Sequence, residues 1–216
     1  SHEIPDVYFI SNRILALYDR SIVFQGSPEE LENFDHPFKE EVIRSLEGLQ
    51  KELTGLYSKR QFKVMHHVQL TQTTSGATYC VAVFSLDDLD IIRTSAGHDA
   101  AQVAIRSLGS YIDKHFGAIG GFSTRRRSNE FVTVLPYSDL AEAESILNDF
   151  AKDFQERGIH DVSAAARRQT MSAGCVEFTV LAGIAQGQPV ADIDSVIDAA
   201  KSQQKEIARL RCDGRG

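Results

Sequence analysis

The chain has 216 residues, of which 42% are hydrophobic and 25% are charged, which is ordinary for a soluble globular protein and unlike a disordered one. No apolar run reaches the ~20 residues of a membrane span and no signal peptide opens the chain, so we expect no membrane segment and a cytoplasmic location. The net charge of −7 argues against a nucleic-acid binder. Three widely spaced cysteines fit a reducing compartment rather than a disulfide framework.

The charge is unevenly distributed along the chain. Residues 1–50 hold four Lys/Arg and ten Asp/Glu, whereas residues 51–216 are close to neutral. We therefore predict an acidic N-terminal extension with a linker helix over 1–50 and a separate domain over 51–216. Within the extension, helical spacing predicts a first helix, and 21–24 has the composition of a short strand. The expected helical stripe is Val7, Ile10, Ile14, Leu17 and Tyr18.

A second helix is predicted over 38–53, where large apolar residues again recur at helical spacing. They are Phe38, Val42, Leu46, Leu49 and Leu53. Two interpretations of this stripe stay open. It is either the buried face of an ordinary helix or the face of a connecting helix that pairs with a second copy, which would make the protein a weak homodimer.

The remaining chain alternates between helical and strand patterns. Helices are predicted over 58–72, 99–116, 140–157 and 193–210, and strands over 79–86 and 177–185. Between the second and third of these helices, 118–135 reads as two strands joined by a polar tip. Because this hairpin interrupts the alternation, we expect an α/β fold with a mixed central sheet of about five strands flanked by helices.

Four short motifs occur in this domain in a fixed order. They are LTGLYSKRQF at 53–62, a Gly-His pair at 97–98, RSNEF at 127–131 followed by an apolar strand, and TVLAGIA at 179–185. In order and spacing they resemble the GGDEF family, the diguanylate cyclase domain of bacterial cyclic-di-GMP signalling. The resemblance covers about residues 50–216 and implies the GGDEF fold.

The same resemblance shows which catalytic groups are missing. Active members hold two Mg²⁺ ions with two carboxylates, and Ser85 and Asn129 stand at those positions. Neither side chain brings the negative charge that Mg²⁺ requires, so phosphoryl transfer would lose its cations. Glu130 is kept, and Asp87 and Asp88 lie nearby, so an atypical cyclase with a shifted metal is an alternative.

The nucleotide contacts of the family are altered as well. Arg127 and Ser128 replace the two glycines that let a nucleotide lie against the hairpin backbone. Arg93 and Gln102 fall where the family reads guanine with Asn and Asp, and an Arg cannot accept a hydrogen bond.

Two further family sites match poorly. The RxxD pattern that binds inhibitory cyclic-di-GMP is represented by Ala118 and Gly121, so we expect no product site. The phosphate-holding Lys and Arg of the family's AKxxGR pattern are assigned to Arg211 and Arg215.

Arg125, Arg126 and Arg127 are consecutive at the expected hairpin tip. They form either a solvated tip or, with Arg93 across the old cleft, an edge that binds anions or an acidic partner. Strand alternation predicts that Arg125 and Arg127 share one face and that Arg126 lies on the other. The histidines have no metal-ligand spacing, so we expect neither a metal nor a cofactor.

These observations predict a catalytically inactive GGDEF-like domain. It would act as a regulatory or protein-interaction module, with a protein partner, at the end of a larger bacterial signalling or scaffold protein. A receptor that binds GTP or cyclic-di-GMP without turnover, and an atypical diguanylate cyclase, are the alternatives.

Overall fold

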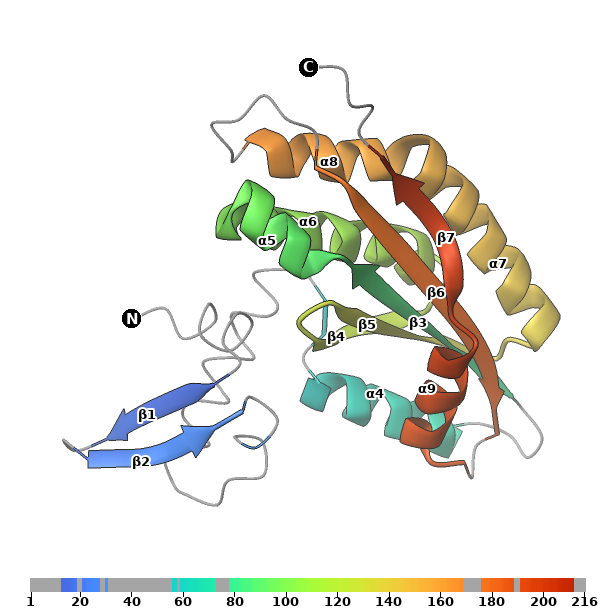
Figure 1. The fold of residues 1–216 in the computed structure, drawn as a ribbon. Helices are drawn as coiled ribbons and strands as arrows, with labels where there is room; N and C mark the ends of the chain where they lie inside the picture. Colours follow the sequence, from blue (N-terminus) through green and yellow to red (C-terminus); the bar gives the residue numbers. More distant parts are fainter. Residues whose placement is uncertain are drawn as a thin grey trace. The chain divides into compact units, whose positions relative to one another are not determined.

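The chain divides into two compact units, residues 1–53 and residues 54–216 (Figure 1). The structure, a computed structural model, describes residues 13–18, 21–27, 30, 56–57, 59–72, 78–168, 176–188 and 191–211. The predicted helix over 38–53 lies outside the described residues.

In the first unit, β1 (Ile14–Tyr18) and β2 (Ser21–Gly26) form an antiparallel two-stranded sheet. The strand predicted at 21–24 is confirmed. The helix predicted through Ile14 to Tyr18 is wrong, because this run pairs with β2 along its whole length. Its apolar residues fit a helical stripe and a strand equally well, and the long-range pairing decides between them.

In the second unit, helices precede and alternate with the strands of one five-stranded sheet, except that β4 and β5 are joined directly and β7 is the last element described. Its elements are α4 (Lys59–Gln72), β3 (Tyr79–Asp87), α5 (Leu89–Ala96), α6 (His98–Ile112), η1 (Asp113–Gly117), β4 (Phe122–Arg127), β5 (Glu130–Pro136), α7 (Leu140–Asp153), η2 (Phe154–Gly158), α8 (Ile159–Arg168), β6 (Phe178–Gly187), α9 (Ile193–Ser202) and β7 (Lys205–Leu210).

The strand order is β4-β5-β3-β6-β7, and each neighbouring pair of strands is antiparallel. The α/β class and the five-stranded sheet are confirmed. Among the described strands every pairing is antiparallel, and the parallel pairing that we expected is limited to an isolated bridge between Tyr57 and Thr124. The crossover helices do join strands that run in the same direction, β3 and β4. However, β5 lies between these two strands, so they do not pair directly.

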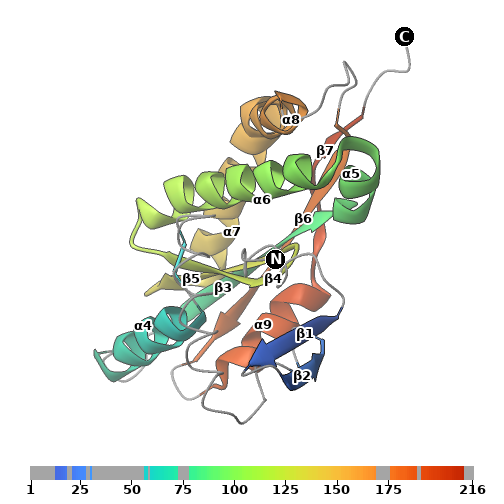
Figure 2. The same cartoon turned by 90° about the vertical axis from the view of Figure 1, so that its left-hand side faces the viewer.

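Two apolar cores lie on the two faces of this sheet. Alternate residues of β3 divide between them, as strand geometry requires. Ala82 and Phe84 belong to the core with α6, α7 and α8, and Val81 and Val83 belong to the core with α4 and α9. Figure 2 shows these two sets of helices on opposite sides of the sheet.

The predicted helix over 193–210 is correct only in its first half, because α9 ends at Ser202 and β7 follows as an edge strand. Gly183 of β6 allows the end of α9 and the turn that follows it to lie directly against the sheet. A Cβ built there would lie 2.1 Å from the Ala200 carbonyl oxygen and 2.7 Å from the Gln204 nitrogen. Helix α9 therefore packs directly against the backbone of β6, and the chain turns at once into β7.

Candidate functional site

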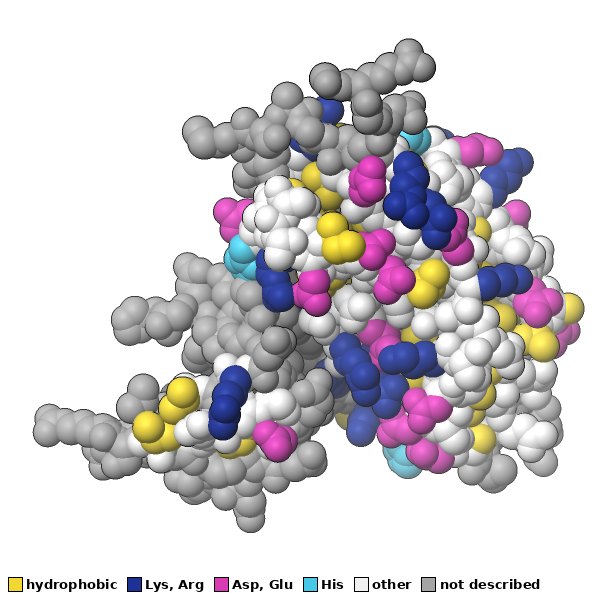
Figure 3. Space-filling view, viewed as in Figure 1, with side chains coloured by type: hydrophobic (Ala, Val, Ile, Leu, Met, Phe, Trp, Pro, Cys, Tyr) yellow, Lys and Arg dark blue, Asp and Glu magenta, His cyan; other side chains and the backbone are white. Residues whose placement is uncertain are grey.

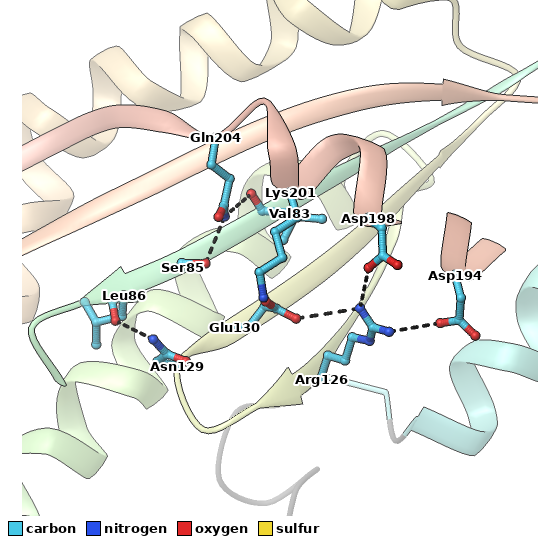
Figure 4. A network of polar contacts seen from close by, with 10 residues as sticks. All are labelled: Val83, Ser85, Leu86, Arg126, Asn129, Glu130, Asp194, Asp198, Lys201 and Gln204. Atoms are coloured by element: carbon cyan, nitrogen blue, oxygen red, sulfur yellow. Dashed lines mark hydrogen bonds and ion pairs between the residues drawn. The ribbon is translucent and has the colours of Figure 1, made fainter. Parts of the chain in front are cut away.

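The motif residues come together where β3 ends and β5 begins. Ser85 pairs with Glu130 across β3 and β5, and with Leu181 of β6 on its other side. The loop before β5 is tied to the same point, because the Leu86 amide donates to the Asn129 carbonyl oxygen at 2.8 Å. The sheet thus places Ser85, Asn129 and Glu130 side by side, as the resemblance implies (Figure 4).

Ser85 faces the protein rather than open solvent. Its residue is 8% exposed, and its Oγ accepts a hydrogen bond from the Gln204 side-chain amide at 2.8 Å. The same amide donates to the Val83 carbonyl oxygen at 3.2 Å. Gln204 thus connects the turn after α9 to the position where the family carries a metal-binding carboxylate.

Asn129 is also engaged within the chain. Its Nδ2 donates to the Leu86 carbonyl oxygen at 3.2 Å, alongside the backbone bond between the same two residues. The side chain is therefore oriented as a donor toward the end of β3. This contact fixes the hairpin loop on β3 and uses the amide in a role that a carboxylate could not fill, since an ionised carboxylate only accepts.

Glu130 is the most buried acid of the site, with a side chain that is 2% exposed. Its Oε2 is bound by the ammonium group of Lys201 at the end of α9. Its Oε1 lies 3.9 Å from the guanidinium of Arg126 on β4. A buried carboxylate needs a compensating charge, and here two side chains of the chain itself supply it.

Arg126 extends this network toward the first turns of α9. Its guanidinium lies 3.2 Å from Asp194 and 3.7 Å from Asp198, both on α9. Together with Glu130 and Lys201 these residues form a closed charge network of three carboxylates and two cations (Figure 4). It links β4, β5 and α9, and two of its members, Arg126 and Lys201, hold Glu130 from opposite sides of its carboxylate.

The three consecutive arginines do not form one exposed cationic edge. The register of β4 against β5 shifts between Arg125 and Arg127, so both Arg126 and Arg127 lie opposite Glu130. This bulge breaks the strict alternation, and the expectation that Arg125 and Arg127 share a face is wrong. In Figure 3, basic and acidic side chains are intermixed over the β4–β5 tip and α9.

Arg125 is 1% exposed and lies within the domain. Its Nε donates to the carbonyl oxygens of Arg127 and Ser128, both at 3.1 Å, and its Nη2 also donates to Ser128. Burial lowers its pKa to about 9, which still leaves the guanidinium protonated at neutral pH. Arg125 therefore fixes the hairpin turn from inside, and of the three arginines Arg127 alone is exposed.

The other predicted anion-binding residues lie apart from this network. Arg93 on α5 forms an ion pair with Asp90 at 2.7 Å. Arg211, just after β7, lies 3.7 Å from Glu177. Arg215 falls outside the described residues.

The two acids after Ser85 point to the surface. Asp87 and Asp88 are exposed, and Asp88 adopts a left-handed conformation with φ of 66° at the turn into α5. Gln102 lies one turn from His98, and their side-chain nitrogens are 3.0 Å apart. Among the described residues, no group of three or more His, Cys, Asp or Glu is arranged to hold a metal ion.

Gly121, which the resemblance assigns to the family's product-binding acid, has no room for a side chain. A Cβ at Gly121 would lie 2.7 Å from the Phe116 carbonyl oxygen and 3.2 Å from that of Val134. Ala118, its companion in the pattern, is exposed. An acid at position 121 would require the backbone around it to move.

Lys201 and Gln204 were not identified from the sequence. The signal that could have found them is AKSQQK at 200–205, a closer match to the AKxxGR pattern than the segment around Arg211. The helix predicted to run on to Leu210 concealed it, because Lys201 would then lie in mid-helix. With α9 ending at Ser202, Lys201 lies at the helix end and reaches Glu130.

Comparisons with known proteins agree with this geometry. The family model described as diguanylate cyclase, GGDEF domain, matches residues 50–207. No curated protein matches the sequence. No helix within the described parts of the chain has the length and hydropathy to cross a membrane.

Solved GGDEF structures share the fold. The GGDEF domain of DgcB from Caulobacter crescentus, in complex with c-di-GMP, is 22% identical with a TM-score of 0.58, over 69% of this chain and 84% of that one. The FimX GGDEF domain from Pseudomonas aeruginosa is 16% identical with a TM-score of 0.56, over 71% and 90%. The Pseudomonas aeruginosa cyclase SiaD, in complex with its activator SiaC, is 15% identical with a TM-score of 0.56, over 76% and 62%.

The match therefore covers most of the chain, and the order of strands and motif positions agrees with it. Over residues 50–207 this chain belongs to the GGDEF family, the family of diguanylate cyclase domains.

Proposed function

We propose that the chain is a catalytically inactive GGDEF domain that serves as a regulatory or protein-interaction module of a larger bacterial signalling or scaffold protein in the cytoplasm. The observation that carries this proposal is that Ser85, Asn129 and Glu130 are each engaged by contacts within the chain. The first two lack the charge that Mg²⁺ requires. The third already has Lys201 as its counter-ion.

The charge network opposes metal binding in a second way. A divalent cation at Glu130 would have to displace the Lys201 ammonium and would then lie close to both Lys201 and Arg126. Like charges at such distances repel strongly in a partly buried site. Restoring one acid would therefore not be enough to rebuild a two-metal centre.

The part of the site that would contact a nucleotide also differs from the family pattern in a way that disfavours binding. Arg127 presents a long exposed side chain where the family has glycine, so a nucleotide could not approach the hairpin backbone as closely. Gly121 leaves no room for the acid of the product site. We therefore expect no nucleotide cofactor in this domain.

The test is an assay for cyclic-di-GMP formation from GTP with Mg²⁺ or Mn²⁺, on the full chain and on Glu130→Ala. The expected result is no product above a control without protein. Product formation that Glu130→Ala abolishes would overturn the proposal and establish an atypical cyclase. A stoichiometric calorimetric signal with GTP or cyclic-di-GMP, without turnover, would instead make the domain a nucleotide receptor.

For the partner, we propose a protein with an acidic segment that contacts Arg127 at the hairpin tip, with Arg93 and Arg211 as further candidates. The SiaD structure is that of a cyclase in complex with its activator, so partner binding is compatible with the fold. Arg127→Glu should reduce capture of a partner from cell lysate, and Lys63→Glu on exposed α4 is the matched control. Equal capture by both variants would reject Arg127 as a contact.

For the N-terminal unit, we propose that residues 1–50 are an acidic extension and linker and that the helix over 38–53 forms a weak homodimer. Leu46 lies in the middle of its apolar stripe. Light scattering at high protein concentration should show a dimer that Leu46→Glu dissociates. A monomer that is unchanged by this substitution would reject the homodimer.

A further inference from the structure

A buried polar pair lies at the end of β3 that is farthest from Ser85. His66 on α4 is 7% exposed and Tyr79, the first residue of β3, is 5% exposed. Their rings meet edge to face, with centroids 5.1 Å apart. Among the residues that the structure describes, the His66 Nε2 and the Tyr79 hydroxyl have no hydrogen-bond partner. Unsatisfied buried polar atoms are rare in folded proteins and call for an explanation.

The surroundings of this pair are apolar and tightly packed. Its neighbours in the core include Phe62, Val81 and Phe122. The β6 backbone lies close to the tyrosine, since a Cβ at Gly187 would be 2.7 Å from the Tyr79 hydroxyl oxygen. The Tyr79 hydroxyl thus has little room on the side of β6 in which to gain a partner.

The charges that act on His66 come from two elements. His67, next to it on α4, opposes protonation, and Asp192, directly before α9, favours it. Burial opposes protonation more strongly than either charge acts, so the pKa of His66 is lowered from its usual 6.5. Burial and, to a smaller extent, Asp192 raise the pKa of Tyr79, so that hydroxyl stays neutral.

We propose that His66 is a pH-sensitive latch that holds α4 on the sheet while its ring is neutral and releases α4 when the ring is protonated. A charged imidazole whose buried Nε2 has no acceptor among the described residues is disfavoured in this core. Protonation is therefore coupled to movement of the ring toward solvent and Asp192. Histidine is the side chain that makes such a change near neutral pH.

Release of α4 would also affect the chain segment that precedes this helix. The helix begins just after Tyr57, whose amide donates to the Ser123 carbonyl oxygen at 3.0 Å and whose carbonyl accepts from the Thr124 hydroxyl at 2.8 Å. This segment joins the two units along the chain and covers the β4 edge of the sheet. Release of α4 would loosen the attachment of that segment. The inference does not depend on whether the domain is catalytic.

The test is hydrogen exchange of the full chain at pH 7.5 and pH 5.5, corrected for the intrinsic effect of pH. In the wild type, the α4 amides should exchange at least about threefold faster at the lower pH, while the α6 amides keep their protection. His66→Phe retains an edge-on ring without a titratable group, so its α4 should show no such change. The control His67→Phe removes an exposed imidazole that opposes protonation of His66, so its α4 should keep the pH response, shifted to a slightly higher pH.

Equal protection of α4 at both pH values in the wild type would overturn the latch, and so would a pH response that persists in His66→Phe. If His66→Phe does not fold, an NMR titration of the His66 ring in the wild type decides the matter. A pKa below 6.5 with loss of α4 contacts on protonation supports the latch, and a pKa at or above 6.5 overturns it.

Discussion

The two ends of β3 differ in the partners that their buried polar groups have. At the Ser85 end, Glu130 lies between Lys201 and Arg126, and the Ser85 hydroxyl receives a bond from Gln204. At the Tyr79 end, the buried His66 Nε2 and the buried Tyr79 hydroxyl have no hydrogen-bond partner within the described part of the chain. The Glu130 Oε1 also accepts no hydrogen bond within the described residues, but the carboxylate as a whole has two cations beside it. One strand therefore connects a buried charge that has counter-ions to buried neutral groups that have no partner.

Because of this difference, we expect the two ends of β3 to be sensitive to different changes. The Ser85 end should respond to loss of a partner, because a compensated buried charge becomes costly when its counter-ion is removed. The Tyr79 end should respond to protons, because burial opposes a new charge on His66 more strongly than Asp192 favours it. Variants that remove a partner at one end and titration at the other can test this contrast.

The largest effect is expected from Lys201→Met, which leaves the Glu130 carboxylate buried without its nearest cation. Because Lys201 is partly exposed and Arg126 remains, we expect a loss of about 2–4 kcal/mol in the free energy of unfolding, toward the lower end of buried ion pairs. Denaturant unfolding measures this loss. Lys205→Met, at an exposed lysine four residues later, should change stability by less than about 0.5 kcal/mol.

The double variant Lys201→Met with Glu130→Gln completes the test. Removing the charge of Glu130 should recover part of the loss, since the cost lies in the unpaired carboxylate. If the double variant is as unstable as the sum of the two single variants, then the two residues do not act as a pair.

The next effect is expected at the hairpin turn. Arg125→Met removes the donors that bind the carbonyl oxygens of Arg127 and Ser128 and leaves those oxygens unsatisfied. We expect a loss of about 1.5–3 kcal/mol, typical of charged hydrogen bonds. Arg127→Met should be nearly neutral in the same unfolding measurement. Similar losses from both variants would show that the tip is stabilised in some other way.

These arginines also show how far the sequence could predict the site. The motif at 127–131 predicts the position of the hairpin correctly, because it contains the polar turn between β4 and β5. The burial of Arg125 could not be predicted from the sequence, because nothing in three consecutive arginines indicates which of them is buried. It depends on a bulge at Arg126, and a bulge is set by contacts with β5 and α9 rather than by local pattern.

The same limit applies to the C-terminal segment. The strand at 79–87 and the helix that follows Gly97 were predictable, because a long apolar run and a long amphipathic stripe are strong local signals. The turn after Ser202 was not, since residues 203–210 continue a helical pattern. Gly183 decides it by letting α9 approach β6 closely, and this is a long-range effect that no local window contains.

A smaller effect is expected from pH. Burial lowers the pKa of His66, so between its native and unfolded pKa values the unfolded chain binds more protons than the native one. This contribution to stability is present above about pH 6.5 and is lost as the pH falls below it. The melting temperature should fall from pH 7.5 to 5.5 and fall less in His66→Phe. Burial and two nearby cations also lower the pKa of His115, so some of the pH dependence should remain.

A parallel pH series on Gln204→Ala sharpens the comparison. This variant removes the donor to Ser85 at the other end of β3 and changes no titratable group. It should lower the melting temperature by a similar amount at both pH values. A steeper pH dependence in Gln204→Ala than in the wild type would mean that the two ends of β3 are coupled.

The smallest effect is expected from Mg²⁺, because Lys201 already neutralises the only carboxylate that the motif retains. Stabilisation by a ligand grows as RT ln(1 + [L]/Kd), so 10 mM Mg²⁺ with a Kd above 100 mM would add less than about 0.1 kcal/mol. The melting temperature of the wild type should therefore not shift when Mg²⁺ is added, with or without GTP. The triple variant Ser85→Asp, Asn129→Asp and Lys201→Ala restores both acids and removes the internal cation, so it should gain a Mg²⁺-dependent increase. A wild-type increase of several degrees with Mg²⁺ alone would show that a cation competes with Lys201 for Glu130, and the charge network would then be a gate for the metal rather than its replacement.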